Sequence, residues 1–382
     1  MCAGWCDLYR RVTSRELNKQ TITRKTRRCV YMQNKFRILM VVLLGCASFF
    51  ALANSLMTVE QEMEVASKIV GPIKNDDNCE SCHALETEAW QNTRHFATFK
   101  DRHRSEEAVA ILETIGERSM KRADDCRQCH YTSEVKNDKL RASFGVSCES
   151  CHGPARDWLA LHSKAGGDTA ADDLKWGTGK AEGPMAREKR LGAAQAAGMI
   201  NSEMIYDIAK NCFGCHTVPN ESIVNDGGHK AGSDFDLVVW SQGEVRHNFS
   251  SSAGAPDSPT NREATAEQRR RLYVTGLMVD LETSLENISR VETRGGEFHK
   301  AMIARANQAR GRVDAVLAAT SIPEIQSGLA KVTANIDEGA TVDAATPIAL
   351  GDATKAFLGN HDGTGLSAID GLIPTETKGN PY

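Results

Sequence analysis

A five-residue pattern, Cys-x-x-Cys-His, occurs four times in this chain and constrains its fold more than any other feature. Two thiols three residues apart can form thioethers with both vinyl groups on one edge of a porphyrin, and the next residue can then place an imidazole nitrogen on the iron. We therefore predict four haems c, one for each motif. The attachment residues, with the histidines as proximal ligands, are Cys79, Cys82 and His83; Cys126, Cys129 and His130; Cys148, Cys151 and His152; and Cys212, Cys215 and His216.

Other uses of paired cysteines explain this pattern less well. A zinc ribbon needs only two cysteine pairs for each metal and gives no reason for a histidine directly after every pair. A thioredoxin-like redox motif needs a βαβ context, which the sequence pattern does not indicate. Disulfides between cysteines three residues apart are strained. Haem attachment is the interpretation that accounts for the histidines as well as the cysteines.

The first 53 residues have the features of an export signal. Residues 35–37, Lys-Phe-Arg, are a short positive region, and residues 38–50 form an apolar core. Residues 51–53, Ala-Leu-Ala, have the small-x-small pattern of a cleavage site. We expect cleavage before Asn54 and a periplasmic mature protein.

Met32 lies at the right distance before this signal to be the true start, so we interpret residues 1–31 as an upstream extension. The apolar run is shorter than a comfortable membrane span, yet an uncleaved anchor and a lipoprotein cut before Cys46 stay open as alternatives. Four of the twelve cysteines lie in the part removed by cleavage: Cys2, Cys6, Cys29 and Cys46. The other eight form the motif pairs, which leaves no thiol for a structural disulfide.

Charge is distributed unevenly along the chain. Residues 1–53 hold ten Lys/Arg and two Asp/Glu, which leaves 36 Lys/Arg and 48 Asp/Glu and a formal charge of −12 for residues 54–382. An acidic mature chain argues against nucleic acid and against anionic lipid as partners. A basic redox protein, or a membrane-bound one linked to quinol, fits better as a partner.

Two further histidines are candidate sixth ligands of iron. The segment from residue 84 to His95 lacks helix breakers, and the predicted helix places His95 about 18 Å along its axis from His83. His95 is therefore better placed to bind a neighbouring haem than its own. His162 follows the third motif on another predicted helix. The alternative for each is a surface histidine that binds nothing.

The fold class that we predict is mainly α, with little regular β structure. Four macrocycles within residues 74–260 would form much of the apolar interior themselves. Short helices and long irregular connections would then enclose the cofactors. Residues 133–141, between the second and third motifs, are predicted to be a polar link of this kind.

A linker rich in Ser, Ala, Gly and Pro, residues 250–259, marks a predicted domain boundary. A tetrahaem domain would cover residues 54–258, and a helical domain with an irregular tail would cover residues 259–382. Helical spacing predicts a hairpin or small bundle over residues 262–340, with apolar Leu277, Leu281, Leu285 and Ile288, then Met302, Ala306, Ala309, Val313 and Val316. This stripe packs within the chain or on the haem core, or it forms a homodimer interface.

Two stretches of the sequence resemble the cytochrome c554 family of nitrifying bacteria. Residues 79–100 combine the first motif with Trp90 and His95, as in the first haem region of that family. Residues 145–166 hold Gly-Val-x-Cys-Glu-Ser-Cys-His-Gly-Pro and a histidine ten residues after the motif, as in its third haem region. The resemblance covers about residues 74–250 and leaves the C-terminal helices outside.

The resemblance implies three haems with two histidine ligands and one haem, at the second motif, with an open distal side. Carried over to this chain, His95 and His162 match distal ligands. Residues 244–247, which end in His247, resemble the third distal site, with His229 and His103 as rivals. The haem on His130 would then be five-coordinate.

Two functions follow from this resemblance as expectations. The first is a periplasmic electron carrier between a quinol- or substrate-oxidising enzyme and a terminal acceptor. The alternative is a reductase of NO or another nitrogen oxide at the open haem on His130. No Cys-x-x-Cys-Lys motif is present, so the likeness to the ammonia-forming nitrite reductases is one of architecture alone.

Overall fold

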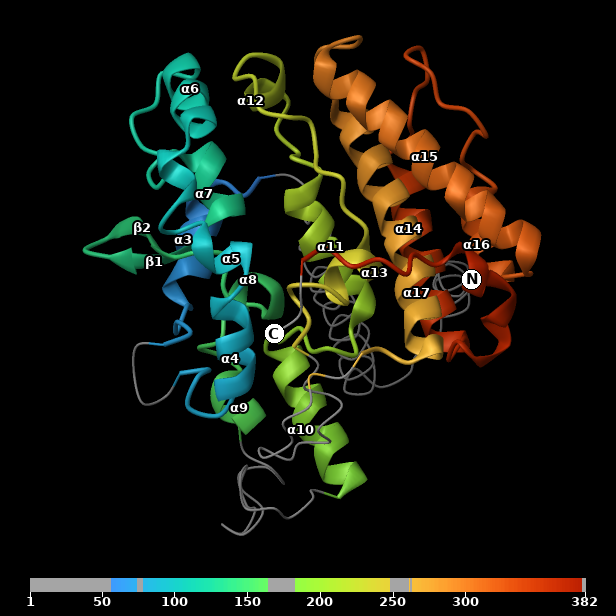
Figure 1. Cartoon of the computed structure of the whole chain (residues 1–382), viewed down its shortest axis with the longest axis horizontal. Helices are drawn as coiled ribbons and strands as arrows, with labels where there is room; N and C mark the ends of the chain where they lie inside the picture. The colour runs from blue at the N-terminus through green and yellow to red at the C-terminus, as the bar shows by residue number, and fades with distance from the viewer. Residues whose placement is uncertain (1–55, 74–77, 164–182, 248–260, 262, 380–382) are drawn as a thin grey trace, which may run out of the picture. The chain divides into compact units, whose positions relative to one another are not determined.

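The computed structural model describes residues 56–73, 78–163, 183–247, 261 and 263–379 (Figure 1). The predicted export signal, its cleavage site, the start at Met32 and the linker of residues 250–259 lie outside these ranges. The described residues are mainly helical and contain one two-stranded sheet, so the predicted fold class is confirmed. None of the described helices has the length and apolar character that a membrane span requires.

Short helices carry or flank the four motifs. Thr58 begins the first of them with a capping box, in which its side chain accepts from the N–H of Gln61 and the Gln61 side chain accepts from the N–H of Thr58. The helices are α3 (Val59–Ser67), α4 (Ala84–Gln91), α5 (Arg94–Ala97), η1 (Arg102–Arg104), α6 (Glu106–Thr114), α7 (Asp124–His130), α8 (Cys148–His152), α9 (Leu159–Ser163), α10 (Pro184–Ala196), α11 (Ile205–His216), α12 (Glu221–Asn225) and α13 (Leu237–Ser241).

The single helix predicted to run through His95 is interrupted. It ends with α4, and α5 begins after Thr93, whose side chain accepts a hydrogen bond from the N–H of Phe96. A threonine that caps a new helix redirects the chain at this point. The prediction of one continuous helix was therefore wrong.

The link predicted for residues 133–141 is a β-hairpin. Strands β1 (Thr132–Lys136) and β2 (Lys139–Phe144) pair antiparallel. Asn137 and Asp138 connect them with φ of 52° and 55°, the left-handed conformation that Asn and Asp tolerate best and that suits a two-residue hairpin turn. The turn chemistry was readable from the sequence, and the prediction missed it.

The C-terminal segment forms the predicted helical hairpin, and further helices follow it. Thr265 and Gln268 begin the first helix with a reciprocal capping box. The predicted irregular tail contains two more elements. The elements are α14 (Ala266–Arg290), α15 (Glu297–Ala319), α16 (Pro323–Leu329), α17 (Ala345–Asn360) and η4 (Thr364–Leu372).

The apolar stripe of the hairpin is buried within the chain. α14 packs against α15 and α17 and also against α11, which carries the fourth motif (Figure 1). Leu281 is completely buried, and its hydrophobic cluster includes Ile111, Tyr131 and Ile223 from the motif half. Packing within the chain thus uses this stripe. A homodimer through the C-terminal helices, like the domain boundary at residue 258, stays a prediction.

Candidate haem-binding site

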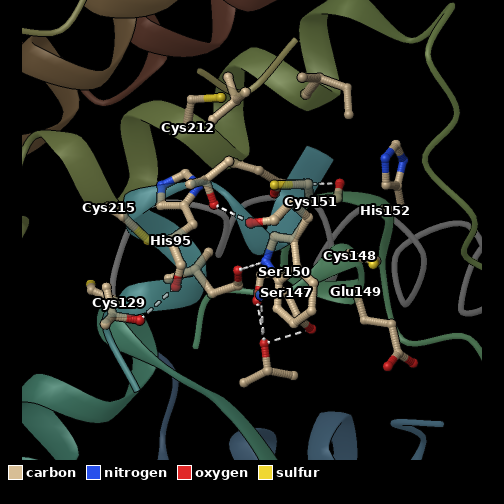
Figure 2. A pocket seen from close by; sticks show the side chains of 18 of the residues that line it. His95, Cys129, Ser147, Cys148, Glu149, Ser150, Cys151, His152, Cys212 and Cys215 are labelled. Carbon is tan, nitrogen blue, oxygen red and sulfur yellow. Dashed lines mark hydrogen bonds between the residues drawn. The ribbon is translucent and has the colours of Figure 1, made fainter. Parts of the chain in front are cut away.

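All twelve attachment residues line one continuous cavity of about 1590 Å³. Pockets for a single drug-sized ligand enclose roughly 300–1,000 Å³, so this space suits more than one large cofactor. Figure 2 shows part of the lining, including the third motif with Cys212 and Cys215 of the fourth. Four histidines outside the motifs also line the cavity: His95, His162, His229 and His247.

Helix geometry explains how each motif presents its three side chains. The second and fourth motifs occupy the last turns of α7 and α11, and the third motif is α8 itself. Residues three and four apart share one face of a helix, so both cysteines and the histidine point the same way. In the first motif, His83 is the residue directly before α4.

Each motif histidine has one imidazole ring from elsewhere in the chain opposite it. The separations of the ring centroids fall within a narrow range. They are 6.0 Å for His83 and His162, 6.4 Å for His130 and His229, 6.2 Å for His152 and His247, and 6.2 Å for His216 and His95. The candidate ligands His95 and His162 thus lie opposite the fourth and first motifs.

These separations fit a metal ion between each pair of rings. A metal–imidazole bond is about 2.0–2.1 Å long, and the bound nitrogen lies about 1.1 Å from the centre of its ring. Two imidazoles on opposite sides of one metal ion therefore have centroids roughly 6.3 Å apart. Rings in direct stacking contact lie closer than this in a typical case, as His216 and Phe235 do at 4.4 Å. The residues present therefore fit haem iron with two axial histidines.

Hydrogen bonds fix the orientation of several of these rings. Nδ1 of His152 lies 2.7 Å from the carbonyl oxygen of Ile200, and Nδ1 of His247 lies 2.6 Å from that of Val245. When Nδ1 donates to a carbonyl, Nε2 keeps the lone pair that binds metal. This arrangement is typical of histidines that ligate metals.

Burial keeps four of these imidazoles neutral. It lowers the pKa of His130, His152 and His162 to about 4 and the pKa of His216 to about 3. Neutral imidazole is the form that coordinates iron. These rings therefore need not lose a proton before they bind iron near neutral pH.

Glu149, inside the third motif, anchors α8 to the preceding chain. Its buried carboxylate accepts hydrogen bonds from the backbone N–H groups of Val70, Gly71 and Ala155, at 2.8–2.9 Å. Burial raises the pKa of this carboxyl, and these hydrogen bonds oppose the rise. The position of Glu149 between the two cysteines does not by itself indicate this role.

Trp90 joins the first and third motif regions, which the resemblance also singled out. Its indole N–H donates to the carbonyl oxygen of Val146, at 2.8 Å. The two cysteine-bearing segments are thereby held on one wall of the cavity.

Contacts between motifs give the order in which the attachment points lie. The thiols of Cys79 and Cys148 are within hydrogen-bonding reach, as are those of Cys129 and Cys215. The side-chain amide of Asn211 donates to the carbonyl oxygen of Cys151, at 2.8 Å, and so joins the third motif to α11. The first motif therefore neighbours the third, the third neighbours the fourth, and the fourth neighbours the second.

The remaining histidines are placed elsewhere. His103, a predicted rival for the third distal site, does not line the cavity. His299 is buried in α15, where its Nδ1 accepts from the N–H of Gly295, and His361 pairs with Glu324. The other rival, His229, lies opposite His130, the site expected to be open. The sequence signal for His229 was weak, because it follows a motif by neither a fixed spacing nor a predicted helix.

Comparisons with known proteins match part of this sequence to one family. Residues 78–153, which hold the first three motifs, match the model of the family described as cytochrome c554 and c-prime. Cytochrome c-554 of Nitrosomonas europaea is 27% identical over 138 residues, which are 33% of this chain and 55% of that protein. The aligned part thus spans about half the length of this relative, and no solved structure matches. The segment that holds the first three motifs is thus similar to the cytochrome c554 family, the family that the sequence resemblance indicated.

Proposed function

We propose that this chain is a c-type cytochrome that binds four haems covalently and relays electrons between redox proteins in the periplasm. The observation that carries the proposal is the set of four imidazole pairs within one cavity, each with a motif histidine as one member. The match to the cytochrome c554 family supports haem c as the cofactor. The number of four rests on the motifs and the pairs.

Axial histidine pairs favour electron transfer over chemistry at the metal. When bound, each haem supplies an iron that takes up and gives back one electron. The two imidazoles of each pair would bind the iron in either oxidation state, so its ligands would rearrange little. The hydrogen bonds at Nδ1 of His152 and His247 keep these rings in place.

The order of the attachment points supports a relay. Contacts between motifs run from the first to the third, on to the fourth and finally to the second. Electrons would enter and leave at the two ends of this series. The ends lie near His83 and His130.

The export signal supports a periplasmic location. Haem attachment and the pairing of all eight mature cysteines in motifs suit a compartment outside the cytoplasm. The formal charge of −12 for residues 54–382 favours a partner with a basic docking face, such as a quinol-linked membrane protein.

A haem count tests the cofactor part of the proposal. After expression with a c-type haem maturation system, the mature chain should show the mass of the polypeptide plus four haems, and the pyridine haemochrome assay should also give four. Joint replacement of Cys126 and Cys129 by serine should lower both numbers to three, while Gln128→Ala in the same motif should keep them. A mass equal to that of the polypeptide alone, without Soret absorption, would contradict the proposal.

Electron exchange tests the relay. Stopped-flow spectroscopy should show reduction of the oxidised protein by a quinol-oxidising membrane fraction and reoxidation by a terminal acceptor protein. Both rates should fall as ionic strength rises, because charged partners are screened by salt. A fully loaded protein that exchanges electrons with no such partner would argue against this function.

A further inference from the structure

We propose that His229 is the distal ligand of the haem attached at the second motif, so that the iron on His130 is closed to small molecules. This inference rests on the proposed function, because it requires a haem at Cys126 and Cys129. It departs from the family resemblance, which implies an open distal side at this haem. The reductase alternative loses its site as a consequence.

The spacing of the two rings is the first argument. The centroids of His130 and His229 are 6.4 Å apart, against 6.0–6.2 Å for the other three pairs. The rings are inclined at 49°, within the range of 13° to 90° that the other pairs span. By this measure the second motif has a partner ring just as the other motifs do.

The orientation of the His229 ring is the second argument. Its Nδ1 lies 2.8 Å from the carbonyl oxygen of Lys230, which assigns the proton to Nδ1 and leaves Nε2 free to bind iron. Its backbone N–H donates to the carbonyl oxygen of Ile223, at 3.0 Å, and Ile223 is buried. The side chain is thus held from both its ring and its backbone.

The C-terminal helices fix the segment that delivers His229. The carboxylate of Glu221, at the start of α12, accepts from the N–H groups of Glu292 and Thr293, both at 2.7 Å. The side-chain oxygen of Asn225, at the end of α12, accepts from the N–H of Phe298, at 2.9 Å. The turn after α14 and the first turn of α15 therefore hold α12 at both ends. This segment lies beyond residues 78–153, where the family match ends.

Competing ligands are accounted for. His95, His162 and His247 each lie opposite another motif, and His103 does not line the cavity. Among the described residues that line the cavity, His229 is thus the histidine left for His130. Its ring would exclude CO, NO or water from that iron.

Spin state and CO binding test the inference in the intact, fully loaded protein. The pyridine haemochrome count comes first, and a value below four would contradict the proposed function rather than this inference. With four haems present, electron paramagnetic resonance of the oxidised protein should show low-spin iron alone. CO should not change the spectrum of the reduced protein. A high-spin signal from one haem in four, or binding of one CO per chain, would overturn the inference.

Variants locate the ligand. His229→Ala should convert one haem in four to high spin and admit one CO per chain, and added imidazole should restore the low-spin spectrum. The matched variant His103→Ala should leave all haems low-spin. Combining His229→Ala with replacement of Cys126 and Cys129 by serine should remove the high-spin signal together with its haem. Retention of four low-spin haems in His229→Ala, or a high-spin signal that survives in the combined variant, would assign the ligand elsewhere.

Discussion

Arg305 on α15 donates a hydrogen bond from its guanidinium to the carbonyl oxygen of Ser233, at 2.7 Å. The hydroxyl of Ser233 in turn lies 2.7 Å from Nδ1 of His216, the histidine of the fourth motif. Arg305 also forms an ion pair with Asp280 on α14. A charged pair of the C-terminal helices thus reaches the fourth haem site through one serine.

Ser233→Ala should raise the midpoint potential of one haem. The serine oxygen accepts from Nδ1 of His216, and such a bond makes the imidazole more basic and favours ferric iron. Its loss should shift that potential upward by tens of millivolts, since about 1 kcal/mol is on the order of 40 mV for one electron. Spectroelectrochemical titration measures the shift. Ser289→Ala, on α14 and outside the cavity lining, is the control and should leave the four potentials unchanged.

Arg305→Gln should lower the potential of the same haem. The positive charge lies two hydrogen bonds from His216. Burial and His95 lower the pKa of His216 most, and Arg305 lowers it further. Removing a nearby positive charge stabilises ferric iron. Arg310→Gln on the same helix, whose partner Asp314 is exposed, should change no potential. Shifts of equal sign in Ser233→Ala and Arg305→Gln would rule out this account.

Asp280 should make stability depend on pH between about 4 and 6. Burial raises the pKa of this carboxyl to about 6, and the Arg305 charge opposes the rise. Over this range the folded chain binds more protons at Asp280 than the unfolded chain does, so the free energy of unfolding falls as pH rises. Urea titrations at several pH values give the free energy of unfolding of the wild type and of Asp280→Asn. As pH rises from about 4 to about 6, this free energy should fall for the wild type relative to the variant. Asp314→Asn, at an exposed pair, should follow the wild type.

Glu62→Ala should destabilise the chain by about 3–5 kcal/mol, the usual effect of removing one partner of a buried ion pair. Both carboxylate oxygens of Glu62 accept from Arg127 at 2.7 Å, and both side chains are at most 5% exposed. Arg127 lies between the cysteines of the second motif. Thermal unfolding of Glu60→Ala, an exposed neighbour on the same helix, gives the control, for which a change within about 0.5 kcal/mol is expected. Equal losses in the two variants would contradict a role for the buried pair.

Gly227→Ala should weaken the bond between His229 and iron. A methyl group at this position would approach the carbonyl oxygen of Ile223 to 2.6 Å and the side chain of Ile115 to 2.9 Å, so the segment before His229 must shift. A mixture of low-spin and high-spin iron at one haem is expected by electron paramagnetic resonance. Gly311→Ala in α15, where nothing beyond the neighbouring backbone of the helix lies within 4 Å of the added methyl, should keep the wild-type spectrum. An unchanged spectrum in Gly227→Ala would show that the segment adapts without moving the ring.

The candidate attachment residues could be identified from the sequence because the chemistry that they suit is local. Five consecutive residues fix two thioether positions and one ligand, and they do so in any fold that forms one helical turn. The family followed from two such stretches and their flanking Trp90, His95 and His162. The capped hairpin of α14 and α15 was likewise visible in helical spacing.

The assignment of distal histidines could not be made in this way, because each pair joins residues far apart in the sequence. His95 follows the first motif but lies opposite His216 of the fourth, and His162 follows the third but lies opposite His83 of the first. His229 depends on contacts between α12 and the turn after α14, which no local pattern records. The break before α5 and the hairpin of β1 and β2 were local features whose cap and turn residues were overlooked.

The large hydrophobic cluster is centred on the C-terminal helices, while a cavity lined by the motifs occupies the middle of the other half. A small cluster around Trp158 in that half contains four buried residues, and another around Phe213 contains six. Under the proposed function, haems would fill the cavity and complete the interior of this half. Under the proposed function, a molecule that lacks one haem would keep a void in this cavity, and its motif half would open more readily to proteases. Degradation of such molecules would remove incompletely loaded protein, so that the remaining molecules would carry all their haems.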